Sequence, residues 1–154
     1  MAIAAERGYE VHLMDVKTTF LNGILDEDIY MMQPPGFTKK GYENWVCKLN
    51  KTIYGLKQSA RYWYQRIKSY MKSIGFHVSK ADSNVYIYTK PPLIVIVAIY
   101  VDDCLIICND KRQLVQKYKK LLSVEFEMTD QGPVQSLLGI QIEINLIKKE
   151  LKLN

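Results

Sequence analysis

The stretch IVAIYVDDCLIIC, from Ile96 to Cys108, constrains the fold more than any other feature, because two adjacent aspartates interrupt an otherwise apolar run. An isolated ionised carboxylate in a low-dielectric interior is disfavoured by several kcal/mol or more, on the order of tens in the Born limit. Two like charges in contact are disfavoured further. Three arrangements relieve this cost: a tight turn exposed to solvent, paired cations, or a bound metal ion.

The apolar segments on either side favour a β-hairpin with the aspartates at its tip. Leu93–Val101 and Cys104–Cys108 both suit buried strands, and only Asp102 and Asp103 separate them. A metal site that uses the two carboxylates fits this pattern, and so does a simple Asp-Asp turn without metal.

Length and composition indicate a globular protein. A chain of 154 residues suits a single domain that buries roughly 68 to 70% of its unfolded surface. A hydrophobic content of 48% with 11% aromatic residues lies in the globular range. No apolar stretch reaches the ~18 residues that a membrane span needs, and Met1–Ala5 lacks the basic flank and the length of a secretory signal. We therefore expect a soluble, intracellular protein with no membrane partner.

The cysteines and histidines argue against a structural zinc site. The three cysteines, Cys47, Cys104 and Cys108, lack C-x-x-C spacing, and the two histidines, His12 and His77, are far apart in the sequence. The cysteines are better suited to pack as small apolar residues in strands. A formal net charge of +5 is compatible with a polyanionic partner and equally with an ordinary lysine-rich surface.

The first third of the chain predicts short elements joined by turns. Ala2–Arg7 is expected to be a helix closed by Gly8, and Tyr9–Val16 a strand with Asp15 near its end. Phe20–Gly23 then turns the chain, and Ile29–Gln33 is a second extended segment.

The clearest predicted helix follows, with Ser59 as its N-cap and Gly75 as its stop. One face of this helix is apolar, at Ala60, Trp63, Tyr64, Ile67, Tyr70, Met71 and Ile74. The other face is basic, at Arg61, Arg66, Lys68 and Lys72. The basic face fits a solvated surface, and it also fits a surface that follows phosphates.

The second half of the chain predicts further strands and a second helix. Asn84–Thr89 alternates in polarity, Leu93–Val101 is apolar, and isoleucines alternate from Ile140 to Ile144. Asn109 or Asp110 is expected to cap the helix. Its inward residues are Leu114, Val115, Tyr118, Leu121 and Leu122. This order of elements predicts an α+β fold, an antiparallel sheet with helices packed on one face.

Four blocks, in the order MDVKTTFLNG, KTIYGLKQSARYW, YVDD and LLGIQIE, resemble the reverse transcriptase of copia-type retrotransposons. YMMQPPGF, Tyr30 to Phe37, and YGLKQ, Tyr54 to Gln58, resemble that family specifically rather than polymerases at large. YVDD alone is a weak signal, whereas several ordered blocks at family-like spacing are a strong one. The resemblance covers nearly the whole chain.

The resemblance implies a polymerase palm with a ferredoxin-like core, a single domain over residues 1–154. Because only fourteen residues precede Asp15, we expect the upstream fingers to be missing. Because the chain stops soon after Leu138-Gly139, we expect the thumb and the ribonuclease H domain to be missing as well. The chain would then be a palm core cut from a longer pol polyprotein that includes integrase and ribonuclease H, or the surviving piece of a decayed element.

Polymerases of this kind use two magnesium ions, which activate the primer 3′-hydroxyl and hold the incoming triphosphate. By resemblance, Asp15 and Asp102 are the main catalytic residues and metal ligands. Asp103 assists them, and Val16 is a further metal ligand. Hard oxygen ligands suit Mg²⁺, for which Mn²⁺ is a substitute.

The resemblance also implies a nucleotide site. Phe20 follows Asp15 by five positions, where the family places the ring that blocks a ribose 2′-hydroxyl and so favours deoxynucleotides. A core aromatic is the structural alternative for Phe20. The segment from Val16 to Thr19, which includes Lys17, would lie beneath the triphosphate and offer backbone N–H groups.

Further substrate contacts are implied around the predicted helix. Tyr54 and Gly55 would contact the incoming nucleotide and the template base, and Gly55 would allow close approach of the backbone. Lys57, in the substrate site, and Arg61, in the nucleic-acid site, would meet phosphates. Tyr100 would lie beside the primer terminus.

Leu138-Gly139 matches the turn with which this family grips the primer. A glycine that simply begins a strand is the alternative for this pair. Both residues are therefore candidates for nucleic-acid binding.

Two functions of different classes follow. The leading hypothesis is the palm of an RNA-directed DNA polymerase that uses an RNA template, a DNA primer and deoxynucleoside triphosphates, in a cytoplasmic virus-like particle if the element is active. The rival is a noncatalytic nucleic-acid-binding remnant, domesticated or decayed, in which tyrosines stack on bases and the basic helix face contacts phosphates.

Overall fold

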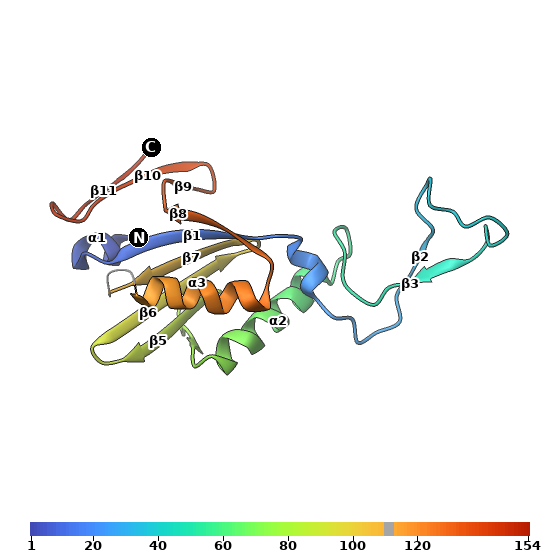
Figure 1. The fold of residues 1–154 in the computed structure, drawn as a ribbon, viewed down its shortest axis with the longest axis horizontal. Coiled ribbons are helices and arrows are strands. Elements are labelled where there is room, and N and C mark those ends of the chain that lie inside the picture. The colour runs from blue at the N-terminus through green and yellow to red at the C-terminus, as the bar shows by residue number, and fades with distance from the viewer. Residues whose placement is uncertain (110–112) are drawn as a thin grey trace. The chain divides into compact units, whose positions relative to one another are not determined.

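A six-stranded antiparallel sheet forms the centre of the larger part of the molecule (Figure 1). The computed structural model describes residues 1–109 and 113–154. The strand order in the sheet is β4-β5-β6-β7-β1-β8. These strands are β1 (Glu10–Val16), β4 (His77–Val78), β5 (Val85–Lys90), β6 (Leu93–Tyr100), β7 (Asp103–Cys108) and β8 (Met128–Pro133).

The chain divides into two compact units. The larger unit comprises residues 1–18 and 68–154 and contains the six-stranded sheet, and the smaller unit comprises residues 19–67. The division falls within helix α2 (Ser59–Ser73). That the whole chain acts as one palm domain stays a prediction.

The elements follow one another in the order of a ferredoxin-like core, with β8 as the last strand of the central sheet in place of the predicted strand at Ile140–Ile144. β1 is followed along the chain by α2, by the β6–β7 hairpin, by α3 (Gln113–Glu125) and by β8, which pairs with the free side of β1. Two helical connections around a central antiparallel sheet are typical of the split β-α-β, ferredoxin-like arrangement. The α+β fold class is therefore confirmed.

Helix α3 covers one face of the sheet, where it packs against β1, β7 and β8. Its buried residues are Leu114, Val115, Tyr118, Lys119 and Leu122. The inward apolar residues are those predicted, except that Leu121 is only half-buried. The hydroxyl of Tyr70 donates a 2.6 Å hydrogen bond to the carbonyl of Leu121, which places the end of α2 beside α3.

The opposite face is covered by the N-terminal helix and by a second sheet. Helix α1 (Ala2–Arg7) ends at Gly8 in the left-handed conformation, as predicted. The second sheet consists of β9 (Ser136–Leu137), β10 (Ile140–Asn145) and β11 (Glu150–Leu153). The core on this face is formed by Ala4, Val11, Leu13, Leu105, Ile107, Val134 and Ile142. Successive side chains of a strand alternate between faces, so β1 contributes to both cores.

The smaller unit holds a tight turn, η1 (Thr19–Asn22), and a short hairpin of β2 (Tyr30–Met32) and β3 (Val46–Lys48). The turn is locked by Thr52, whose buried hydroxyl donates to the carbonyl of Phe20. A side chain on Gly23 would collide with Thr52 and would meet the Cβ of Tyr62 at 2.9 Å. The predicted turn at Phe20–Gly23 is therefore confirmed, and it depends on this close packing.

The predicted cap Ser59 is wrong, and so is Asn109, one of the two alternatives for the cap of α3. Ser59 is the first residue of α2, and its hydroxyl donates a 2.6 Å hydrogen bond to the carbonyl of Ile53. The side chain of Asn109 binds the main chain of Ile94 and Pro92 at 2.9 and 2.6 Å instead of capping a helix. The other candidate cap, Asp110, lies outside the described residues.

None of the helices within the described ranges has both the length and the apolar character to cross a membrane.

Candidate active site

Asp15 lies directly opposite Asp103 in the central pair of strands. β1 and β7 pair antiparallel, and their register sets Asp15 against Asp103, next to Met14 against Cys104. Opposed residues of such a pair point to the same face of the sheet, with Cβ atoms about 4.5 to 5.5 Å apart. The expectation that neighbouring strands supply these two carboxylates is therefore confirmed.

The hairpin turn presents Asp102 beside them. Tyr100 pairs with Asp103, so the two-residue turn is Val101-Asp102, and Asp103 is already in β7 rather than at the tip. The main-chain carbonyl of Asp102 accepts a 2.8 Å hydrogen bond from the N–H of Val16. The end of β1 is thus bound to the turn that carries the second carboxylate.

Val101 is in the left-handed region, with φ 55°. This conformation is unusual for a β-branched residue, because its side chain then crowds the backbone. Such strain persists only when the surroundings hold it, and it is concentrated at functional sites. Thr18, two residues after the N–H that binds Asp102, has φ 47° and is a second case.

The three aspartates repel one another. The pKa of Asp103 is raised, first by partial burial and then by the neighbouring charges of Asp102 and Asp15. Like charges directly opposite in a sheet are destabilising. A cation between them would remove this repulsion.

The donor set suits a magnesium ion only in part. Within residues 1–109 and 113–154, no three His, Cys, Asp or Glu side chains are gathered closely enough to hold a metal ion. The three aspartates adjoin one another without forming a closed set of ligands. Their chemistry fits Mg²⁺, which prefers oxygen ligands and usually binds one or two carboxylates together with waters and substrate phosphates.

Lys17 is held beside the end of β1 by Glu127. Its ammonium lies 2.8 Å from a carboxylate oxygen of Glu127, and its main-chain N–H donates a 2.8 Å bond to the carbonyl of the same residue. The pKa of Lys17 is raised, chiefly by its hydrogen bond to Glu127. The ammonium group of Lys17, which was predicted to bind substrate, is therefore exposed and paired with the carboxylate of Glu127.

A hollow of about 190 Å³ opens beside Asp103. Its lining includes Tyr100 and Asp103 from the hairpin, Asn84 from the segment before β5, and Leu137 from β9. Tyr100 is 58% exposed, so its ring is accessible at the edge of the hollow.

Leu138-Gly139 forms the two-residue turn that follows Leu137. Leu137 pairs with Ile140, and both turn residues have positive φ, 52° and 80°. This is the pattern of a type I′ hairpin turn. Leu138 is 55% exposed although it is a leucine in a conformation that favours Asn or Gly.

The predicted nucleotide-binding residues of the smaller unit are partly brought together. The rings of Phe20 and Tyr54 meet edge to face with centroids 4.7 Å apart. Gly55 has φ 92° and open space where a side chain would be, so the backbone is accessible there. Thr19 is fully buried, so it offers no exposed surface to a ligand.

Lys57 and Arg61 are exposed near the start of α2. Their side chains are free of burial and accessible to phosphate groups. Their roles stay predictions.

A family model described as reverse transcriptase (RNA-dependent DNA polymerase) matches residues 1–153. The chain belongs to this reverse transcriptase family. The copia-type resemblance seen in the sequence blocks is confirmed by relatives from plant and yeast transposons.

Three relatives illustrate the reverse transcriptase match. The retrovirus-related Pol polyprotein from transposon TNT 1-94 of Nicotiana tabacum is 45% identical over 92% of this chain and 11% of its own length. The corresponding polyprotein from transposon RE1 of Arabidopsis thaliana is 39% identical over 92% of this chain and 10% of its own. A putative transposon Ty5-1 protein of Saccharomyces cerevisiae is 35% identical over 84% of this chain and 42% of its own. The chain thus spans about a tenth of the plant polyproteins.

Two residues of this reverse transcriptase domain were missed by sequence reasoning. Thr52 holds the turn that carries Phe20, and it lies within the KTIYGLKQ block, so its place in that block was the available signal. Glu127 holds Lys17 from a distant segment, and nothing local in the sequence announces that pairing.

Proposed function

We propose that this chain is the palm of an RNA-directed DNA polymerase of a copia-type retrotransposon, which transfers deoxynucleotides onto a primer 3′-hydroxyl. The observation that carries the proposal is the pairing of Asp15 with Asp103 beside the Val101-Asp102 turn. Three neighbouring carboxylates repel one another, and binding of divalent cations is the role that accounts for their being placed together.

The proposed metal ligands are the carboxylates of Asp15, Asp102 and Asp103 and the main-chain carbonyl of Val16. When two Mg²⁺ ions are bound, or Mn²⁺ in their place, they supply Lewis-acid activation of the primer hydroxyl and neutralise charge on the leaving pyrophosphate. Asp102 is positioned for this role by its main-chain bond to Val16.

The remaining residues would bind and select the nucleotide. Phe20, supported by the ring of Tyr54, would exclude a 2′-hydroxyl by its bulk. Lys17 would meet the triphosphate, with Glu127 controlling where its ammonium lies. Gly55 would let the main chain approach the nucleotide closely.

The proposed partners are an RNA template, a DNA primer and deoxynucleoside triphosphates. Tyr100 and Leu138, which are 58% and 55% exposed, would contact the primer. The chain would act within a pol polyprotein that includes integrase and ribonuclease H, in a cytoplasmic virus-like particle.

Primer extension by the polyprotein that contains this chain tests the proposal. Asp102→Asn is expected to lower the rate of nucleotide addition about a hundredfold or more, because a charged group at the reacting centre is lost. Asp28→Asn, at an exposed aspartate that pairs with Lys48 at 2.6 Å, is the matched control and should leave the rate unchanged. Equal rates for Asp102→Asn and the unmodified enzyme would refute the proposal.

A second candidate, noncatalytic nucleic-acid binding, is favoured by the surface of the β2–β3 segment. Three large side chains there are strongly exposed: Met32 at 81%, Phe37 at 82% and Trp45 at 66%. Lys39 lies 4.6 Å from the centre of the Tyr42 ring, so positive charge and aromatic faces are combined. Such surfaces stack on single-stranded bases. This function alone predicts binding that is independent of Mg²⁺ in a chain that extends no primer.

A further inference from the structure

A lysine is buried between helix α3 and the central sheet. Lys119 on α3 has only 5% of its surface exposed. Lysine is almost never fully buried unless its charge is paired. Its neighbours therefore have to account for it.

Lys119 joins two strands through its ammonium group. Nζ donates a 2.6 Å hydrogen bond to Oδ1 of Asp130 on β8 and lies 2.8 Å from Nδ1 of His12 on β1. The same oxygen of Asp130 accepts a 2.8 Å bond from the N–H of Gly132. One cation thus connects α3, β1 and β8.

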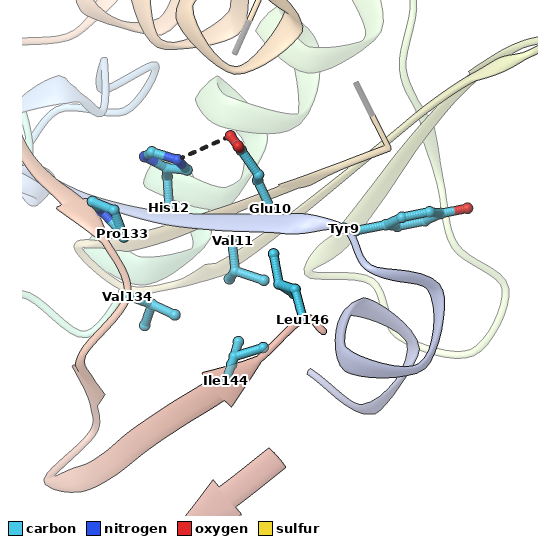
Figure 2. Close-up of a pocket in the computed structure, with 8 residues that line it drawn as sticks. All are labelled: Tyr9, Glu10, Val11, His12, Pro133, Val134, Ile144 and Leu146. Atoms are coloured by element: carbon cyan, nitrogen blue, oxygen red, sulfur yellow. Dashed lines mark ion pairs between the residues drawn. The ribbon is translucent and has the colours of Figure 1, made fainter. Parts of the chain in front are cut away.

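The contact defines the protonation state of His12. An ammonium group has only donors, so Nδ1 must accept, and the imidazole is neutral with its proton on Nε2. Nε2 faces Glu10, whose carboxylate oxygen is 3.5 Å away. Figure 2 shows this pair on one side of β1, with Val11 pointing to the other side toward Ile144 and Val134.

Asp130 flanks an irregularity in the pairing of β8 with β1. Leu13 pairs with Gly132, but the next residue, Met14, pairs with Asp130, so one residue of β8 is extra. A bulge of this kind resets which residues oppose each other, and a slip by one residue would turn every side chain to the other face. Beyond the bulge, Thr129 lies opposite Asp15.

The register of β8 also determines the position of Glu127. β8 begins at Met128, which pairs with Val16, and Glu127 directly before it binds both the main chain and the ammonium of Lys17. Asp130, which Lys119 binds, is therefore one residue from Thr129, the strand partner of Asp15. It is three residues from Glu127, which binds Lys17.

We propose that Lys119 is a positioning residue for nucleotide transfer: by binding Asp130 and neutral His12 it holds the bulge in β8 and thereby the strand beside Asp15 and Lys17. This rests on the proposed function, since it assigns a role within the same site. Lys119 touches no reacting group and acts only through β8.

The proposal implies a dependence on pH. The titratable groups around His12 are Glu10 on β1, Lys119 on α3 and Asp130 on β8, and the thiol of Cys108 on β7 lies opposite Glu10. The pKa of His12 is lowered, first by burial and then by the charge of Lys119. A base whose pKa is lowered on folding contributes stability above its unfolded value of about 6.5 and loses it as the pH falls below that value. Protonation would set two cations against each other and release the bond.

The primary test uses steady-state primer extension by the full polyprotein. Lys119→Met keeps the length and apolar stem of the side chain, and removing such a buried charge for an apolar residue is often tolerated in folding. We expect kcat to fall about tenfold to a hundredfold with KM for primer-template nearly unchanged, as for other small misplacements of a reacting group. Lys120→Met, the exposed neighbour on α3, is the matched control. A folded Lys119→Met enzyme with unchanged kcat would overturn the proposal.

A second variant keeps the test decisive if Lys119→Met fails to fold. His12→Gln supplies an acceptor that does not titrate, so its activity between about pH 7.5 and 5.5 should fall at least threefold less than that of the unmodified enzyme. Identical pH profiles for the two enzymes would overturn the proposal.

Hydrogen exchange of the 154-residue chain separates this proposal from the function on which it rests. The intrinsic exchange rate of an amide changes with pH, and this change is first subtracted. After that, amides of β8 near Thr129 should exchange at least about tenfold faster at pH 5.5 than at pH 7.5, and His12→Gln should abolish this difference. The same exchange result is expected even if the polyprotein extends no primer. A failure to extend primer would refute the proposed polymerase function and not the role of Lys119 in positioning β8. Exchange of β8 that ignores both pH and His12→Gln would overturn the positioning role.

Discussion

At the scale of single residues, the site combines groups that each oppose folding. Asp103 on β7 lies opposite Asp15 on the adjacent strand β1. The pKa of Asp103 is raised by burial and by the charges of Asp102 and Asp15. Val101 beside them is in a conformation that β-branched residues avoid. Strain and repulsion at one place are typical of sites where function, rather than stability, selects the residues.

Asp102→Asn is expected to stabilise the folded chain at neutral pH when divalent cations are absent. A carboxyl group whose pKa is raised on folding binds its proton more tightly in the folded state, so the free energy of unfolding falls as pH rises above the unfolded value of about 3.9. Removing the charge of Asp102 reduces the repulsion on ionised Asp103, so less folding stability is lost as the pH rises. Because these side chains are partly solvated, the gain is a few tenths to about 1 kcal/mol.

Urea unfolding at about pH 4 and about pH 7 measures this effect, since it grows as the carboxylates ionise. Asp28→Asn serves as the control for loss of one negative charge elsewhere. Magnesium should reduce the difference between Asp102→Asn and the unmodified chain. A variant that is less stable than the unmodified chain at neutral pH would contradict the prediction.

Val101→Gly should also stabilise the chain. Glycine adopts positive φ without steric strain, and the side chain of Val101 is 42% exposed, so little packing is lost. The strain relieved is about 1 to 2 kcal/mol, and the greater freedom of glycine in the unfolded chain offsets part of it. The control, Val46→Gly in β3, has 55% exposure and ordinary φ and should be destabilising. Thermal unfolding measures the effect. An equal decrease in the melting temperature of both variants would be inconsistent with strain at Val101.

At the scale of elements, periodicity predicted some segments and could not predict others. α1, β1, α2, α3 and the β6–β7 hairpin all carry clear helical or apolar patterns, and all form. β8 was not predicted, because MTDQGP has neither apolar alternation nor β-branched enrichment, and it is a strand by virtue of pairing with β1. Strand formation of this kind depends on tertiary context.

The site shows the same division between local and non-local information. The apolar run around Asp102 and Asp103 predicted the hairpin from local sequence alone. The partnership with Asp15 depends on the register of β1 against β7, which local patterns do not encode and which only the family resemblance suggested. The buried charge of Lys119 was concealed, because a lysine beside Tyr118 on an amphipathic helix is usually exposed.

A substitution in the turn between β9 and β10 can distinguish a structural role of Leu138 from a role in binding. Leu138→Asn creates Asn-Gly, the preferred pair for a type I′ turn, and should stabilise the chain by a few tenths to about 1 kcal/mol. If Leu138 contacts the primer, the same change removes apolar contact and should weaken primer-template binding by about threefold to tenfold. Urea unfolding and binding by fluorescence anisotropy measure the two effects.

Leu153→Asn in β11 is the matched control, since Leu153 is also 55% exposed. It should leave primer-template binding unchanged. Unaltered binding by Leu138→Asn would show that this turn is structural only.

At the scale of the whole molecule, charge predicts how the chain meets nucleic acid. The formal net charge is +5, and Lys57 and Arg61 are exposed at the start of α2. Binding to RNA–DNA primer-template should weaken log-linearly with salt concentration, because phosphate contacts release counterions. Arg61→Gln should reduce the magnitude of the slope by about 1, whereas Lys90→Gln, exposed at the end of β5, should not. A salt slope that Arg61→Gln leaves unchanged would exclude a phosphate contact at Arg61.

The pairing of β1 with β7 has a consequence for biosynthesis. Asp15 is translated before Asp103, and the two meet only when the loop formed by the intervening chain has closed. Long-range closure of this kind is slow compared with the formation of helices or hairpins. In a nascent chain on the ribosome, the proposed metal site therefore cannot assemble until the segment that contains β7 has emerged.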